Sequence, residues 1–104
     1  MELKLSVLIF QEGEAWVAQA LERDMAAHGG SPYAALAAIQ QVLQAHVNFD
    51  TRHQRTPLSR LARAPEIYWK AFQHGKPLPI PPQPTTPALF EVAISNEPIE
   101  ARPC

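Results

Sequence analysis

The chain has 104 residues, of which 46% are hydrophobic, and its nine Lys and Arg residues nearly balance its ten Asp and Glu residues. A chain of this length supports one hydrophobic core rather than two. A net charge of −1 gives no overall field that would attract nucleic acid or anionic lipid, which excludes a polycationic binding protein. The single cysteine, Cys104, cannot form an internal disulfide or a cysteine metal cluster, and this fits a reducing compartment.

No secretion signal is visible, because the short apolar run from Leu5 to Phe10 is followed by polar residues rather than by a cleavage site. The stretch 25–49 carries no Asp, Glu, Lys or Arg and is long enough to cross a bilayer. Its glycines, proline, glutamines and histidines make membrane insertion costly. We therefore expect a soluble, cytoplasmic protein.

Three strands are expected in the first 28 residues. Alternation of apolar and polar residues over 3–9 predicts the first strand, and a turn at Glu12 and Gly13 leads into a second strand over 15–21 that forms a hairpin with it. A short third strand over 25–28 ends at Gly29 and Gly30, where we expect positive φ angles.

A helix is expected to begin after Ser31, because serine followed by proline is typical of a helix N-cap and first helical position. It should run to about Phe49. Its apolar residues recur at helical spacing, and this stripe should lie on the sheet while the glutamines face the other way. The stripe consists of Ala35, Leu36, Ile39, Val42, Leu43 and Val47.

The segment 51–76 is locally basic, with six Lys and Arg residues and one Glu. Thr56 and Pro57 predict the start of one short helix, and Pro65 predicts a second that continues to Gly75. Six of the eleven prolines then lie within 76–87, which favours an extended, stiff connector. Alternation at Phe90, Val92 and Ile94 predicts a fourth strand, and residues 96–104 are expected to form a flexible tail.

The residues 16–31, which read Trp-Val-Ala-Gln-Ala-Leu-Glu-Arg-Asp-Met-Ala-Ala-His-Gly-Gly-Ser and precede an alanine-rich helix, resemble the HicB-like antitoxin domain. The resemblance covers about residues 3–46 and implies a partial ribonuclease H-like α+β fold of order β-β-β-α-β. The expected sheet has four mixed strands, with strand four parallel to strand one. Residues 1–95 would form this single domain, with 51–76 as a basic helical insertion and 77–87 as the connector.

The resemblance implies a prokaryotic, non-enzymatic protein that binds and neutralises a HicA-like ribonuclease toxin, or an orphan domain of the same type. Repressor-type members carry a DNA-binding segment, whereas this chain has the basic segment and the proline-rich connector in that place. DNA binding is therefore not implied. The alternative function is RNA binding or metal-dependent hydrolysis that uses the basic segment or a His/Asp cluster.

The candidate partner-binding residues are an aromatic residue and four arginines, because guanidinium groups bind phosphates and carboxylates with two hydrogen bonds. They are Arg52, Arg55, Arg60, Arg63 and Trp69. A solvated helix face is the alternative reading of the same arginines. We name no catalytic residue and no cofactor, since no serine or cysteine is set up as a nucleophile and the acids available for a two-metal nuclease are Asp24 and Glu91 alone.

A metal site is conceivable at His46, Asp50 and His53, because spacings of four and three would place them on one face if the helix continued to His53. The alternative is a polar helix end, where histidines interact favourably with the helix dipole. The resemblance implies no metal, so these three residues are candidates only.

A second sheet face also needs cover. Leu8 and Phe10 point away from the expected helix, and we expect that Trp16, Ala18 and Ala20 cannot all be covered by it. Either the Pro65 helix covers this face, through Ile67, Trp69 and Phe72, or another subunit does. Exposed strand edges and apolar patches favour a homodimer or higher homo-oligomer.

Overall fold

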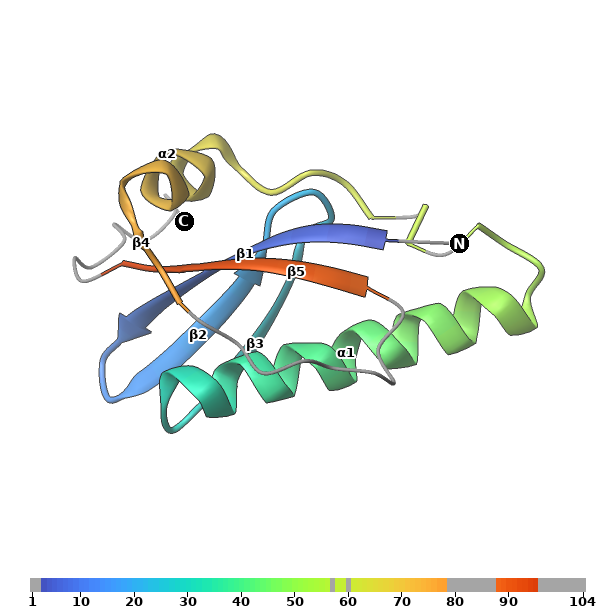
Figure 1. Cartoon of the computed structure of the whole chain (residues 1–104). Helices are drawn as coiled ribbons and strands as arrows, with labels where there is room; N and C mark the ends of the chain where they lie inside the picture. Colours follow the sequence, from blue (N-terminus) through green and yellow to red (C-terminus); the bar gives the residue numbers. More distant parts are fainter. Residues whose placement is uncertain (1–2, 57, 60, 79–87, 96–104) are drawn as a thin grey trace.

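The computed structural model describes residues 3–56, 58–59, 61–78 and 88–95, which form a mixed five-stranded sheet with a helix on each face (Figure 1). The α+β class is therefore confirmed. The elements in chain order are β1 (Leu3–Glu12), β2 (Ala15–Ala20), β3 (Met25–Gly29), α1 (Pro32–Arg52), α2 (Glu66–His74), β4 (Lys76–Pro77) and β5 (Ala88–Ile94). In the sheet the strands lie in the order β3-β2-β1-β5-β4.

β1 is the centre of the sheet. It pairs antiparallel with β2, through a tight turn in which Gly13 has a φ of 62°, a left-handed conformation that glycine adopts without strain. On its other side β1 pairs in parallel with β5, with Val7 opposite Val92. The predicted return of the last strand beside the first, in parallel, is confirmed, although this strand begins at Ala88 rather than at Phe90.

The sheet has five strands, so the expected count of four is wrong. Lys76 and Pro77, which the sequence assigns to the start of the proline-rich connector, form β4 and pair antiparallel with β5. Leu78 continues this pairing, since its N–H donates to the Val92 carbonyl at 2.9 Å. A proline can occupy this place because an edge strand has one side on which no backbone donor is needed. Connector residues 79–87 and tail residues 96–104 lie outside the described residues.

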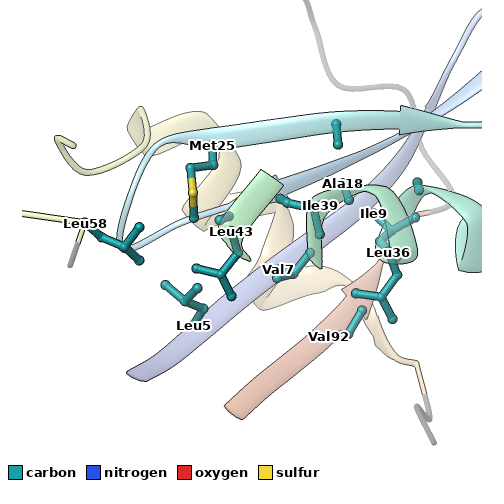
Figure 2. Packing of buried hydrophobic residues seen from close by; sticks show 13 residues of the cluster. Leu5, Val7, Ile9, Ala18, Met25, Leu36, Ile39, Leu43, Leu58 and Val92 are labelled. Atoms are coloured by element: carbon teal, nitrogen blue, oxygen red, sulfur yellow. The ribbon is translucent and has the colours of Figure 1, made fainter. Parts of the chain in front are cut away.

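α1 covers one sheet face, as its apolar stripe predicts. Ala35, Leu36, Ile39 and Leu43 are buried on it, while Val42 and Val47 pack at its margins. In Figure 2 Met25, Leu43 and Leu58 gather at one end of this core and Ile9, Leu36 and Val92 at the other. Side chains of this kind stabilise the fold by about 1.5–3 kcal/mol each when they are fully buried.

The prediction that Trp16, Ala18 and Ala20 cannot all lie on the α1 face is wrong. Ala18 pairs with Ile9 and Ala20 with Val7, and residues opposite each other in an antiparallel pair share a face. All three side chains belong to the core beneath α1, where the alanines leave room for the helix to approach. The opposite face of β2 instead presents Val17 and Gln19.

Gly29 serves a purpose different from the expected one. Neither Gly29 nor Gly30 has a positive φ angle. A Cβ atom on Gly29 would lie 2.5 Å from the carbonyl carbon of Ala34 and would also collide with the backbone nitrogen of Ala35. The glycine is therefore required because the first turn of α1 crosses directly over the end of β3.

The second sheet face is covered within the chain by α2. Leu8, Phe10, Val17 and Leu21 form a second buried cluster with Tyr68, against which Trp69 and Phe72 are partly buried. The rings of Phe10 and Tyr68 lie 5.8 Å apart. The expectation for Ile67 is wrong, because its side chain is 38% exposed and Tyr68, one residue on, points into the core instead.

Among its described residues, which exclude Pro57 and Arg60, the basic segment contains one helix rather than two. The Pro65 helix forms, with Pro65 and Gly75 as its caps, but no helix forms in the described residues between His53 and Pro65. That stretch runs as an irregular chain from the end of α1 to α2 (Figure 1).

Ser31 caps α1 as predicted, because its hydroxyl accepts a hydrogen bond from the Ala34 N–H at 3.1 Å. Replacing it with alanine, Ser31→Ala, should lower the free energy of unfolding by about 1 kcal/mol, since one helix N–H loses its acceptor. Urea denaturation measures the change. Ser31→Asp, which keeps an acceptor at this position, should retain most of the stability, and equal losses in both variants would contradict the capping role.

Candidate functional site

The candidate arginines lie at two places rather than in one patch. Arg52 ends α1 and Arg55 follows it closely, whereas Arg63 lies just before α2, on the other side of the sheet from α1 (Figure 1). Arg60 is outside the described residues. All three described arginines are exposed, so each is accessible to a partner.

Arg63 and Trp69 form the first arginine–aromatic pair. The guanidinium carbon of Arg63 lies 4.1 Å from the centre of the Trp69 ring, well within the range of a cation–π interaction. Trp69 is half-buried and packs against the cluster beneath α2. Its indole Nε1 is buried and has no hydrogen-bond partner among the described residues. The structure thus brings together two of the residues that the sequence proposed for partner binding.

Arg55 belongs to a second arginine–aromatic cluster that the sequence did not indicate. Phe49 is 39% exposed, and the His53 ring stacks on it with 4.2 Å between the ring centres. The guanidinium carbon of Arg55 lies 6.0 Å from the centre of the same phenyl ring. Beside Phe49 an open hollow of about 400 Å³ is lined by Val42, Ala45, His46 and Phe49. We call this region the α1 hollow.

A buried carboxylate fixes the chain that carries Arg55. Asp50 is fully buried, and its Oδ2 accepts a hydrogen bond from the Leu58 N–H at 2.8 Å. The Asp50 carbonyl accepts from the Arg55 N–H at 2.8 Å. Gln54 and Leu58 have φ angles of 56° and 65°, conformations that L residues seldom adopt. Asp50 therefore holds a tight loop that returns the fully buried Leu58 side chain to the core.

Arg63 is held in place by backbone hydrogen bonds between its neighbouring residues and the β2–β3 turn. The Asp24 N–H donates to the Ala62 carbonyl at 2.6 Å, and the Ala64 N–H donates to the Leu21 carbonyl at 2.9 Å. The Arg23 guanidinium adds a hydrogen bond to the Leu61 carbonyl at 2.9 Å. The segment is thus attached to the sheet on both sides of Arg63.

The structure does not assemble the candidate metal ligands. α1 ends at Arg52, so His53 is the C-cap residue, and its Nδ1 lies 2.8 Å from the Phe49 carbonyl oxygen. Asp50 points into the core toward Leu58, whereas His46 lines the α1 hollow. Within the described part of the chain no three His, Cys, Asp or Glu residues are grouped as a metal site would require.

Acidic residues at the β2–β3 turn have structural partners. The two carboxylate oxygens of Glu22 accept hydrogen bonds from the N–H and the hydroxyl of Ser6, at 2.7 and 2.8 Å. Asp24 Oδ1 accepts from Nε2 of the buried Gln19 at 2.7 Å. Glu22 therefore extends the pairing of β1 beyond the end of β2. Asp24 accepts one hydrogen bond of the buried Gln19 amide, whose Nε2 also donates to the Ala20 carbonyl at 2.9 Å.

No helix in the described residues has the length and apolar content needed to span a membrane. Comparisons with protein-family models, with curated proteins and with solved structures find no match to this chain.

Proposed function

We propose that this chain is a non-enzymatic, cytoplasmic protein-binding module that resembles HicB antitoxins. In this proposal it neutralises a HicA-like ribonuclease toxin, or acts as an orphan domain of the same type. The arrangement of its elements supports the resemblance: three antiparallel strands, a covering helix and a last long strand parallel to the first. That order is the one expected of a partial ribonuclease H-like core.

The observation that carries the proposal is the pairing of surface arginines with aromatic rings. Arg63 lies over Trp69 and Arg55 lies near the exposed Phe49. Arginine and aromatic residues are enriched among the residues that dominate binding energy at protein interfaces. The ring beneath each guanidinium limits its freedom, so that less conformational entropy is lost when a partner carboxylate binds. Acidic groups of a partner fit each of these pairs, which lie on different sides of the sheet.

A binding experiment tests this proposal. The double variant Arg55→Ala/Arg63→Ala should bind a HicA-like toxin, made catalytically inactive and encoded beside this chain, roughly 30-fold more weakly than the wild type, since two interface arginines together contribute about 2 kcal/mol or more. The matched control Lys4→Ala/Lys76→Ala removes the same charge from exposed positions elsewhere on the sheet and should change the affinity little. Titration calorimetry measures both, and thermal unfolding checks that both variants fold.

Absence of toxin binding by the wild type, or equal losses in both double variants, would overturn the proposal. The same arginines and rings could instead hold RNA phosphates and stacked bases, so labelled single-stranded RNA is titrated in parallel. RNA binding that weakens steeply with salt, without toxin binding, would favour the RNA-binding alternative.

A further inference from the structure

The two edges of the sheet differ in how they are protected. β4 is two residues long and consists of Lys76 and Pro77, which both discourage pairing with another strand. β3 has five residues, Met-Ala-Ala-His-Gly, without proline or a charged side chain. Among the described residues no backbone hydrogen bond joins β3 to any strand or loop except β2. Within the described residues, its outer row of backbone groups therefore has no strand partner.

The edge strand continues into an uncharged helix. Residues 25–49, which include all of β3 and most of α1, contain no Asp, Glu, Lys or Arg. A solvated helix normally carries charged residues on its outer face, whereas the centres of protein interfaces are depleted of them. A second surface could be brought against this region without removing a charge from water.

The α1 hollow opens on the side of the helix that faces the β3 edge. Ala35 lies against Gly29 of β3, which places this flank of the helix over the edge strand. Spacings of three and four residues from Ala35 lead along the same flank through Ala38 and Val42 to Phe49. Ala38 and Val42 pack against the buried cluster that contains Met25 and Ala27 of β3, and Val42 also lines the hollow, so the hollow begins on the flank of α1 that contacts the edge strand.

We propose that a second copy of this chain occupies this surface. Its β3 pairs antiparallel with β3 about a two-fold axis near Ala27, and the two sheets become one continuous sheet. The α1 helices of the two copies then lie antiparallel on the same face, each filling the hollow of the other. An antiparallel strand edge is complementary to itself, which suits an isologous contact.

Both parts of the surface are needed for a stable pair. A specific interface requires a buried surface area of about 1,000 Å². Pairing of the five β3 residues alone buries less than this, and the flank of α1 supplies additional apolar area. The proposed toxin binding uses Arg63 on the other side of the sheet and Arg55 beside Phe49 at the hollow, so the two proposals share Phe49 but are tested by different variants. Loss of toxin binding with an unchanged mass, or a monomeric mass with unchanged toxin binding, would tell the failure of one proposal from the failure of the other.

Light scattering at high micromolar concentration tests the proposal. The wild type should have twice the chain mass of 11.6 kDa. Ala45→Glu places a charge in the hollow and should weaken the dimer at least about tenfold, which corresponds to 1.4 kcal/mol. The control Ala37→Glu puts the same charge at an exposed position on another side of α1, outside the hollow, and should leave the dimer intact. Circular dichroism establishes that both variants fold.

Amide hydrogen exchange supplies a readout specific to the strand edge. Outward-facing amides in Met25–Gly29 should exchange more slowly as the protein concentration rises, while amides of Lys76 and Leu78 should not respond. A monomeric mass for the wild type would overturn the proposal, and so would a dimer that is equally sensitive to both glutamates or whose β3 amides are indifferent to concentration. Protection of β3 by an added extended peptide, without dimerisation, would assign the edge to a different occupant.

Discussion

Gly29→Ala should destabilise the protein by at least about 3 kcal/mol. The added methyl group would lie 2.5 Å from the Ala34 carbonyl carbon and against the Ala35 backbone, so α1 would have to move away from β3. Inserting an atom into a packed region commonly costs about 1–3 kcal/mol, and a collision with backbone rather than with a flexible side chain belongs at or above the upper end. Because small domains are stable by only about 5–15 kcal/mol, urea denaturation would detect this change easily.

Gly30→Ala is the matched control for this substitution. A Cβ atom on Gly30 has no neighbour within 4 Å, and the residue has no positive φ angle. Its replacement should change the stability by less than about 1 kcal/mol and could raise it, since alanine restricts the unfolded chain. Comparable losses at both positions would show that the close approach of α1 to β3 does not decide the stability.

The regular elements of this fold were predictable wherever a local rule and a burial pattern agreed. Alternation in β1, the Ser31-Pro32 cap and the apolar stripe of α1 each specify their element without knowledge of the rest of the chain. β4 was not predictable, because two residues carry no periodicity and Pro77 argues against a strand. The face occupied by Trp16, Ala18 and Ala20 depends on the register with β1, which is a long-range property.

The candidate site was predictable in part for the same reason. Sequence composition indicated the arginines and Trp69, but their grouping into two separate aromatic pairs depends on the path of an irregular segment. Phe49 was missed because it lies outside the apolar stripe of α1 and nothing in the sequence indicates that its ring is exposed and stacks on His53. Asp50 was considered as a metal ligand because of its spacing, and a helical position facing the core gives it a structural role instead.

Asp50→Ala should lower the free energy of unfolding by about 3 kcal/mol. The Asp50 side chain is fully buried and accepts the Leu58 N–H at 2.8 Å, and removing the acceptor leaves this N–H without its partner, which costs about 1–3 kcal/mol in a buried site. Without it, the left-handed conformation of Leu58, which costs an L residue about 1–2 kcal/mol, loses one of the contacts that hold it. The Leu58 side chain should then leave the core more readily, and the loop that carries Arg55 should loosen with it.

Asp50→Asn distinguishes this role from a simple loss of packing. The asparagine keeps the size of the side chain and a carbonyl oxygen that can accept the Leu58 N–H, so it should lose only about 1 kcal/mol, because this hydrogen bond is retained. Urea denaturation compares the two variants, and hydrogen exchange at the Leu58 amide should accelerate strongly in Asp50→Ala alone. If both variants lose the same stability with unchanged exchange at Leu58, the carboxylate does not hold the loop. The positions of Leu58 and Arg55 would then have to depend on the packing of Leu58 itself.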